Sequence, residues 1–549
     1  MAKVTGGEAI VKSLLSHGVD TIFGLPGVQN DYFYNALYDE GGKIRVIHTR
    51  HEQGAAYMAM GYALSTDRVG VYNVVPGPGL LNTTAALSTA YARNARVLCL
   101  TGQIQSIYIG RGIGFLHELP DQLGIIERLT KWAARIQSPA EAPEQIAEAF
   151  KQLYLGRPRP VGLECALDVL SAKAEVDLNP IELEVRLPPV DLEAIDQAAR
   201  LLGQAKNPLI FIGSGAVEAG EELEQLAEAL QAPVIASYTG LGILSSRHYL
   251  SHPLPTGHAL WPKADVVLAV GTRLQMPQMN WGLDPEIKII RIDLDPQEHK
   301  RITAPEISLV ADSRAALQAL IPAVEKYNSV RPSCKEEMQG LKADLARRLE
   351  RIEPQVTFLK IIREELPEDG IFVDEVTQVG YVSRIALPVY RPRTFITSGY
   401  QGTLGFGFAT ALGVKAAHLD KPVLGIAGDG GFMFNVQELA TAVQHQLNTV
   451  TLIFNDGAFG NVRRMQKNNY GNRLIASELH NPDFVKLAES FGAQGLRAES
   501  PEALRLAIRK GFETNGPTLI EIPVGEMPEP WSLMMLPKVR PVSSSTMSR

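Results

Sequence analysis

The chain has 549 residues, of which 45% are hydrophobic and 21% charged; this ordinary globular composition exceeds what one hydrophobic core usually organises, so we expect about three domains. The formal net charge is -7, with Lys and Arg spread along the chain, which excludes a basic face for nucleic acid and a polybasic membrane segment. The three cysteines are odd in number and lack metal-ligand spacing, so they indicate no disulfide framework.

The N-terminal stretch, Met1–Asp20, has the pattern of an amphipathic helix, and its apolar positions are interrupted too often for a secretion signal or a membrane span. We therefore expect a cytoplasmic protein. After this stretch, short β-rich runs alternate with segments of helical length and period, which favours a parallel sheet covered by helices. These runs are 20–27, 45–52, 69–79, 95–103 and 159–169.

Two further series of apolar runs follow. Prolines and alternating charges at 172–191 are typical of a linker. The second series comprises 207–215, 232–240, 264–273 and 287–295. Charged helical sequence at 329–354 then leads to the third series, at 370–376, 394–399, 422–431, 449–456 and 517–524. The predicted fold class is therefore α/β, with three doubly wound parallel-sheet domains at 1–171, 190–335 and 352–530.

The third series contains an acidic residue where a buried strand is expected to end. Asp429 lies between Gly428 and Gly430, directly after an apolar run. Residues 431–454 have the pattern of one helix followed by one strand, and Asn455 comes next. Because ligands gather at the carboxyl ends of parallel strands, we expect Asp429 and Asn455 to lie close together and to offer a carboxylate and an amide oxygen to a hard cation such as Mg²⁺. The glycines let the backbone approach a phosphate closely.

This pattern, Gly-Asp-Gly and then Asn after one helix and one strand, resembles the signature of the thiamine-diphosphate enzymes. The resemblance implies that Asp429, Asn455 and the backbone carbonyl of Gly457 hold the metal ion. It also implies that the diphosphate is bound at the glycines of the motif, Gly428, Gly430 and Gly431. An Asp between glycines is otherwise an ordinary turn.

The family divides its cofactor between domains, so the N-terminal domain should contribute a glutamate. Glu52 follows the apolar run at 45–48 and begins an Ala-rich helical segment, and it matches that glutamate closely. The resemblance implies that Glu52 hydrogen-bonds the pyrimidine ring and so activates C2 of the thiazolium ring. Outside this context a Glu at a helix start is a favourable charge at the N-terminus.

Two more segments agree with the family pattern. In "SGYQGTLGFGFATALG", Leu404 resembles the large aliphatic residue that wedges the cofactor into its bent form, and the carbonyl of Gly402 would meet the aminopyrimidine. In "VDEVTQVG", Thr377 or Gln378 stands where relatives touch the diphosphate, although a simple loop amide explains this position equally well.

The resemblance covers about Gly6 to Val524, in the order pyrimidine-binding, central and diphosphate-binding domains. Within the family the chain resembles the group of acetolactate synthases, benzoylformate decarboxylases and benzaldehyde lyases. The stretches "PGPGLLNTTAALSTAY" and "TGQIQSIYIG" are similar to the acetolactate synthases. Acetolactate synthases bind FAD through their central domain, but "GTRLQMPQMNWG" departs from their pattern and Glu218 replaces the third glycine of a dinucleotide motif, so we expect no flavin. The stretch "GAFGNVRRMQ" also lacks the tryptophan with which acetolactate synthases favour a second keto acid.

Four residues are candidates for shaping the substrate chemistry. His117 falls where pyruvate decarboxylases carry a histidine pair, so it either shuttles protons or is a structural loop histidine. Asn461 occupies the place of a catalytic Glu in pyruvate decarboxylases and could hydrogen-bond a reaction intermediate. Val28 and Gln29 are expected to line the substrate pocket.

The sequence thus predicts a thiamine-diphosphate- and Mg²⁺-dependent lyase or transferase that decarboxylates a 2-oxo acid, joins its acyl fragment to a carbonyl acceptor, or does both. The alternatives are a non-decarboxylating C–C lyase or hydrolase acting on a hydroxyacyl-CoA or a cyclic diketone, and a nicotinamide oxidoreductase resting on the Gly-rich strand ends. A binding protein without catalysis is disfavoured by the presence of Glu52, Asp429 and Asn455. The family's arrangement implies a homodimer or homotetramer with sites at the subunit interface, a small carbonyl substrate, and no nucleic-acid or membrane partner.

Overall fold

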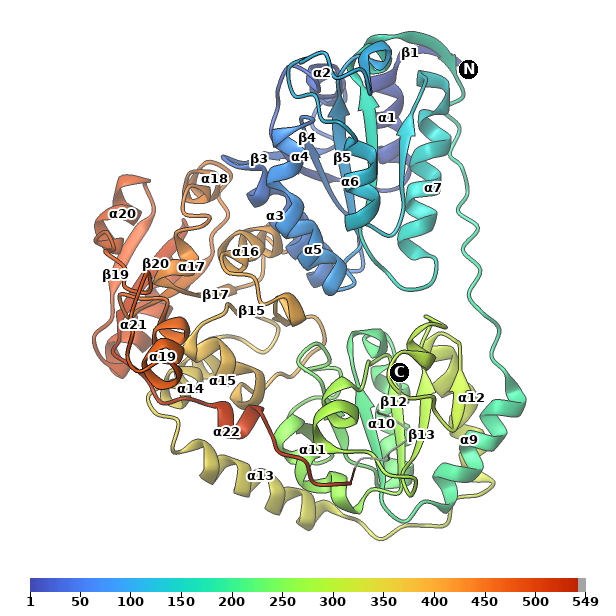
Figure 1. The fold of residues 1–549 in the computed structure, drawn as a ribbon, viewed down its shortest axis with the longest axis vertical. Helices are drawn as coiled ribbons and strands as arrows, with labels where there is room; N and C mark the ends of the chain where they lie inside the picture. The colour runs from blue at the N-terminus through green and yellow to red at the C-terminus, as the bar shows by residue number, and fades with distance from the viewer. Residues whose placement is uncertain (542–549) are drawn as a thin grey trace. The chain divides into compact units, whose positions relative to one another are not determined.

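The computed structural model describes residues 1–541, and within them three six-stranded sheets of parallel strands carry helices on their faces (Figure 1). The predicted fold class, α/β with three doubly wound parallel sheets, is confirmed. The described chain packs into two compact units. One comprises Met1–Arg186, Gly370–Thr377 and Ser398–Val524; the other comprises Leu187–Asp369, Gln378–Thr397 and the described part of Gly525–Arg549. The boundaries predicted for three domains stay a prediction.

The first sheet has the order β3-β2-β4-β5-β7-β6. Its central strands are buried throughout and largely apolar, as in a parallel sheet covered on both faces. The strands are β2 (Thr21–Gly24), β3 (Arg45–His48), β4 (Gly70–Val74), β5 (Val97–Gln103), β6 (Ala133–Ile136) and β7 (Val161–Ala166).

The second sheet, in the other unit, has the order β11-β10-β9-β12-β13-β14 around a core of Leu, Ile, Val and Ala side chains. Its strands are β9 (Pro208–Ile212), β10 (Val234–Ala236), β11 (Ser251–Pro253), β12 (Val266–Val270), β13 (Lys288–Ile292) and β14 (Ile307–Leu309). The charged segment that precedes the third series forms α13 (Lys335–Leu349), as its helical pattern predicts.

The third sheet has the order β16-β15-β17-β18-β20-β19. Gly428, the last residue of β17, pairs with Phe454 of β18, so the residues that follow them, Asp429 and Asn455, lie side by side at the ends of the two strands. The strands are β15 (Ile371–Val373), β16 (Phe395–Ile396), β17 (Val423–Gly428), β18 (Val450–Asn455), β19 (Gln494–Arg497) and β20 (Thr518–Pro523).

Two predicted elements differ in the structure. The N-terminal stretch begins with strand β1 (Ala2–Thr5) before helix α1 (Gly6–Ser16), so the expectation of one helix there is wrong at its start. Strand β1 pairs antiparallel with β8 (Lys173–Val176), which lies inside the segment predicted to be a linker. This pairing satisfies backbone groups of both segments, and the irregular linker begins only after β8.

Helices α3 (Glu52–Ser65) and α16 (Phe406–Ala417) connect the first and third sheets within one compact unit and lie side by side (Figure 1). Both helices are almost wholly buried and are rich in Ala and Gly. At Gly61 a Cβ would lie 2.2 Å from the carbonyl oxygen of Thr410, and at Gly413 it would lie 1.9 Å from that of Met58. The glycines therefore allow the two backbones to touch.

The C-terminal segment packs on the second sheet's domain. The guanidinium of Arg540, which is buried, donates to the carbonyls of Trp261 and Pro262 and forms an ion pair with Asp284 at 2.9 Å. Leu536 joins the apolar cluster of Trp261 and Trp281. No helix among residues 1–541 is long and apolar enough to cross a membrane, and the cytoplasmic location stays a prediction.

The glycine contact between α3 and α16 gives a test of this packing. Gly413→Ala should lower the free energy of unfolding by roughly 1–3 kcal/mol or more, because the added methyl meets the rigid backbone of Met58. Thermal unfolding measures the effect. The matched control is Gly340→Ala on α13, where nothing lies within 4 Å; there we expect stabilisation by about 0.5–1 kcal/mol from helix propensity alone. Equal melting temperatures for the two variants would contradict the packing.

Candidate active site

Glu52 lies at the carboxyl edge of the first sheet. It is the first residue of α3 and is 9% exposed, and its Oε2 accepts a hydrogen bond from Nδ2 of Asn82 at 2.9 Å. Asn82 ends the short helix α4 (Pro78–Asn82), which follows β4. A Cβ at Gly79 would lie 3.7 Å from Oε1 of Glu52, so the α4 turn faces this carboxylate directly. The Glu52 carboxylate is therefore held in a buried position beside an amide donor.

Gln29 and His117, two residues predicted at the substrate side, contact each other. Nε2 of Gln29 donates to the carbonyl of Leu116 at 3.1 Å, which directs the amide oxygen of Gln29 toward the ring of His117. That oxygen lies 3.1 Å from Nδ1 of His117 and can only accept, so the Nδ1 atom carries a hydrogen. Gln29 is buried, whereas His117 is half-buried and has a left-handed backbone (φ 68°). Val28, also predicted for the pocket, is exposed.

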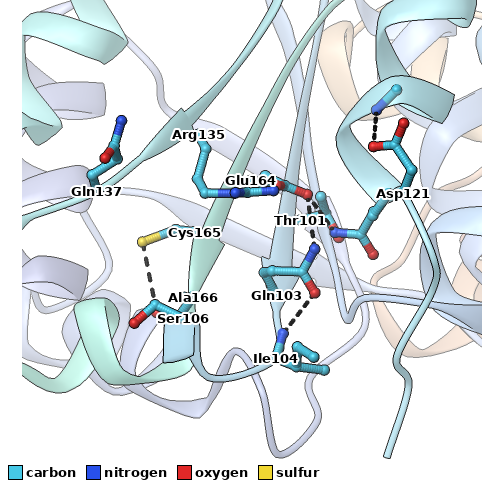
Figure 2. A network of polar contacts seen from close by, with 12 residues as sticks. Thr101, Gln103, Ile104, Ser106, Asp121, Arg135, Gln137, Glu164, Cys165 and Ala166 are labelled. Atoms are coloured by element: carbon cyan, nitrogen blue, oxygen red, sulfur yellow. Dashed lines mark hydrogen bonds and ion pairs between the residues drawn. The ribbon is translucent and has the colours of Figure 1, made fainter. Parts of the chain in front are cut away.

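A buried polar network holds the loops that carry these residues. Figure 2 shows Gln103 and Arg135 pointing toward the carboxylate of Glu164, which is fully buried on β7. The carboxylate accepts from Nε2 of Gln103 at 3.1 Å, Nε2 of Gln122 at 2.9 Å and Nε of Arg135 at 2.6 Å. The amide oxygen of Gln122 in turn accepts the N–H of Gly77 at 2.9 Å.

Gly77, which is hydrogen-bonded to Gln122, also contacts the loop that bears His117. Its backbone is left-handed (φ 61°), and a Cβ there would lie 2.5 Å from the carbonyl oxygen of His117. The loop after β4 and the loop bearing His117 are therefore in direct contact, and the Glu164 network supports both.

The predicted metal ligands converge at the carboxyl edge of the third sheet. Asp429 begins the short helix α17 (Asp429–Phe432) after β17, and Asn455 ends β18. Nδ2 of Asn481 lies 2.6 Å from Oδ2 of Asp429 and 3.0 Å from Oδ1 of Asn455, so both oxygens point at one atom. A donor nitrogen held between two ligand oxygens occupies the kind of position that a cation takes, and the carboxylate and amide donors fit Mg²⁺.

Outer hydrogen bonds fix the orientation of the Asn455 amide. Its Nδ2 donates to Oε1 of Glu521 at 2.8 Å, which leaves Oδ1 facing Asp429. Arg497 holds Glu521 in turn, at 2.8 Å. The N–H of Gly457 donates to Oδ1 of Asn455 at 3.2 Å, and the carbonyl of Gly457 accepts from the N–H of Leu479 at 2.8 Å. One lone pair of that carbonyl remains for a metal ion, so its predicted ligand role stays a prediction.

The pKa values around this oxygen cluster are raised. Burial raises the pKa of Asp429, opposed by hydrogen bonds from Asn481 and from backbone N–H groups. Burial and the negative charge of Asp429 together raise the pKa of Asp456 to about 6, although Arg463 opposes this shift. Carboxylates that are costly to ionise together in a buried cluster are stabilised by a bound cation, which agrees with a metal site here.

The turn bearing Leu404 is held by a second buried acid. Gly402 and Gly405 have left-handed backbones (φ 58° and 78°), and Leu404 between them is only half-buried, so it does not plug the core. The fully buried carboxylate of Glu375, after β15, accepts the N–H of Gly405 at 3.1 Å and that of Gly407 at 2.7 Å. Burial raises the pKa of Glu375 to about 8, and the neighbouring charge of Asp374 adds to this shift.

The segment after Gly430 differs from the prediction of one helix before β18. It forms α17 and a separate helix, α18 (Glu438–Gln444). The break between them has a structural reason: Asn435 is buried there, and its Nδ2 donates to the carbonyl of Gly405 at 2.6 Å, which ties the motif to the Leu404 turn.

The remaining predicted residues lie as follows. A Cβ at Gly428 would be 3.5 Å from the methyl group of Thr377, and one at Gly431 would be 3.6 Å from the carboxyl carbon of Glu375. Gln378 is buried and begins α15 (Gln378–Ala386) in the other compact unit. Asn461 is half-buried in the first turn of α19 (Gly460–Asn469). At Gly430 a Cβ would lie 2.6 Å from the ring of Phe459, so a larger residue does not fit.

Sequence reasoning missed Asn481 and Glu375. Asn481 precedes Pro482 and the N-cap residue Asp483 of α20 (Phe484–Ser490), so the sequence explains it fully as part of a helix start. Glu375 could have been found from the sequence. Asp374 and Glu375 follow a buried strand directly, and two acids at such a position need hydrogen-bond donors or a positive charge nearby.

Comparison with known proteins decides the family. Residues 4–125, 195–320 and 375–522 match the N-terminal TPP binding domain, the central domain and the C-terminal TPP binding domain of the thiamine pyrophosphate enzymes. The chain belongs to the thiamine pyrophosphate enzyme family. Its thiamine diphosphate is bound by the first and third of these domains, in agreement with the resemblance in the sequence.

The chain is also similar over nearly its whole length to several individual proteins. It is 33% identical to a probable 2-ketoarginine decarboxylase, AruI, of Pseudomonas aeruginosa, with 94% of both chains covered. It is 34% identical to a probable acetolactate synthase large subunit of Methanocaldococcus jannaschii (94% of this chain, 91% of the relative). The acetolactate synthase large subunit of Corynebacterium glutamicum is 32% identical (97% and 88%).

The raised pKa of Glu375 predicts a pH dependence of stability. The folded protein holds the Glu375 proton up to about pH 8, because its pKa is raised to about 8, whereas the unfolded chain releases it near the ordinary pKa of 4.5. The contribution of this group to stability therefore falls as the pH rises between these values. The limiting slope is about 1.4 kcal/mol per pH unit. In Glu375→Gln the difference in melting temperature from the wild type should therefore shift in the variant's favour from pH 5 to pH 8. Melting curves of the cofactor-free protein measure it, and a constant difference would contradict the assignment.

Proposed function

We propose that the chain is a Mg²⁺-dependent thiamine-diphosphate enzyme that decarboxylates a 2-oxo acid and passes the acyl fragment to a proton or to a carbonyl acceptor. The observation that carries this proposal is the convergence of Oδ2 of Asp429 and Oδ1 of Asn455 on one nitrogen atom, at 2.6 and 3.0 Å. Such a pair of oxygens beside glycine-rich turns suits a cation that bridges to a diphosphate. The carbonyl of Gly457 would complete the protein's share of the ligands.

When bound, thiamine diphosphate supplies the electron sink that accepts the electron pair released with CO₂. Glu52 moves a proton at its carboxyl oxygens, and its burial keeps water away from them. Leu404, half-buried between two left-handed glycines, presents an aliphatic side chain to the ligand. Gly428, Gly430, Gly431 and Thr377 would line the diphosphate.

His117 is the proposed proton carrier on the substrate side. Gln29 fixes the hydrogen at Nδ1, so Nε2 is the atom that accepts a proton and later donates it. Asn461 would hydrogen-bond the substrate without taking its proton, and Val28 would contact its apolar part. The names of the similar proteins support decarboxylation as well as carboligation.

A second candidate is acetolactate-type transfer to another 2-oxo acid, favoured by the two acetolactate synthase relatives. Against it, Met465 and its neighbours on α19 include no tryptophan. The departures at 271–282 favour a protein without flavin. A panel of 2-oxo acids, with and without a second keto acid, separates the two candidates by product.

We propose a homodimer, or a pair of dimers, with each site shared between subunits. Both groups of site residues carry exposed apolar side chains, Val28 and Leu116 on one side and Tyr400 and Phe434 on the other. Apolar side chains gathered at a polar site are typical of a surface that a partner covers. A second copy of the chain is the partner that the family's arrangement supplies.

Substitutions of Asp429 and of Glu52 should have different effects on cofactor binding and on proton exchange. Asp429→Ala should abolish Mg²⁺-dependent binding of thiamine diphosphate, because it removes the only anionic metal ligand proposed. Glu52→Gln should keep binding but slow exchange of the C2 proton by roughly 10²–10⁴-fold, the scale of a lost acid–base group. Calorimetry and proton NMR measure the two quantities. Unchanged cofactor affinity in Asp429→Ala would refute the metal site, and wild-type exchange in Glu52→Gln would refute the proton role.

The same two variants test the shared site. If Glu52 and Asp429 of different subunits meet, mixing the inactive variants gives hybrid dimers in which one site has both residues intact, and activity returns. Inactive hybrids of confirmed mixed composition would show that each site lies within one chain.

The proposed roles of His117 and Glu52 belong to different steps of the reaction, so they can be tested separately. His117→Ala should leave C2 proton exchange near the wild-type rate, while steady-state turnover of a 2-oxo acid falls by roughly 10²-fold, the loss typical of one positioned proton donor. Exchange and turnover are measured on the same preparation, so the first is an internal control for the second. Turnover that stays unchanged for several substrates would make His117 a structural residue.

A further inference from the structure

The N-terminal end of α3, which bears Glu52, is held by a glutamate from the diphosphate-binding part of the same chain. Glu438, the first residue of α18, is fully buried. Its Oε1 accepts the N–H of His51 at 3.0 Å, and its Oε2 accepts the N–H of Arg50 at 3.1 Å. These are the two residues immediately before Glu52, and His51 is the N-cap of α3.

The contact is closely fitted. The hydroxyl of Thr441 donates to Oε2 of Glu438 at 2.6 Å, so both carboxylate oxygens have donors. A Cβ at Gly54, in the first turn of α3, would lie 2.6 Å from Oε1, so only glycine lets the carboxylate approach the helix end. A carboxylate at a helix N-terminus also interacts favourably with the helix dipole, and its charge strengthens these hydrogen bonds.

The hydrogen bonds of Glu438 do not involve the residues around the proposed metal site. Every hydrogen-bond partner that the described residues give its side chain is on Arg50, His51 or Thr441, and none is Asp429, Asn455 or Asn481. A neighbouring contact to the same Arg50 is made by exposed groups: its Nη2 donates to Oε1 of Gln444 at 3.1 Å. The buried carboxylate of Glu438, by contrast, binds the backbone N–H groups directly in front of Glu52.

We propose that Glu438 is a positioning residue, which fixes the peptide groups of Arg50 and His51 and thereby aims the carboxylate of Glu52 at the pyrimidine ring of bound thiamine diphosphate. This inference rests on the proposed function. A displacement of about 1 Å at a catalytic group can cost roughly 10²-fold in rate, so the hydrogen bonds of Glu438 control proton transfer without touching the cofactor.

The test is C2 proton exchange in the Mg²⁺- and thiamine-diphosphate-loaded protein. Glu438→Ala should slow exchange by roughly 10- to 100-fold, while the dissociation constant of the cofactor changes by less than about threefold. Glu438→Gln keeps one oxygen for the N–H groups of Arg50 and His51, so it should restore most of the rate. Gln444→Ala is the matched control, since it removes a contact to the same Arg50 from the same helix, and it should exchange at the wild-type rate.

A double variant shows whether Glu438 acts through Glu52. Adding Glu438→Ala to Glu52→Gln should slow exchange little beyond Glu52→Gln alone, because the group being aimed is already lost. Multiplied effects, or wild-type exchange in Glu438→Ala, would overturn the proposal. If Glu438→Ala does not fold, Gly54→Ala displaces the same carboxylate and should slow exchange likewise, and a wild-type rate there would overturn it. Normal exchange in Glu52→Gln would instead refute the proposed function itself.

Discussion

The contact of α3 with α16 is the constraint on which the arrangement of the site depends. Two glycines, Gly61 and Gly413, bring the helix backbones to a distance at which a single added methyl would meet a carbonyl oxygen. Such contact leaves little freedom of sliding or rotation between the helices. Since Glu52 begins α3 and the Leu404 turn leads into α16, the same packing fixes the positions of both residues.

The sequence predicts the centres of the three sheets well and their edges poorly. Every strand that the apolar runs miss in the three sheets, β6, β11, β14 and β19, lies at the edge of its sheet. Central strands of a parallel sheet are buried on both faces and therefore form long apolar runs, whereas edge strands are short and partly polar. The N-terminal strand β1 was missed for a related reason: its partner β8 is distant in sequence, and the pairing has no local signature.

At the site, the sequence indicates which residue types matter, and the structure adds how they are oriented. The proximity of Asp429 and Asn455 follows from strand order, because each residue directly follows a paired strand position. The direction of the Asn455 amide depends on Glu521 and Arg497, and the tautomer of His117 depends on Gln29; these partners are remote in sequence. Long-range hydrogen bonds of this kind leave no periodic pattern, which is why Asn481 and Glu438 could not be recognised from the sequence.

At the C-terminal segment, the boundary of a domain in the family comparison differs from the boundary of the part of the chain that packs together. The match to the diphosphate-binding domain ends at residue 522, yet Leu536 and Arg540 pack into the domain of the second sheet. A fragment of the central domain cut at its own sequence limits would lose the aliphatic cover of Trp261 and Trp281. It would also leave three backbone carbonyls, of Trp261, Pro262 and Ala264, without their guanidinium donor. We therefore expect that domain, produced alone, to be more stable when the C-terminal peptide is fused through a linker or supplied as a separate chain.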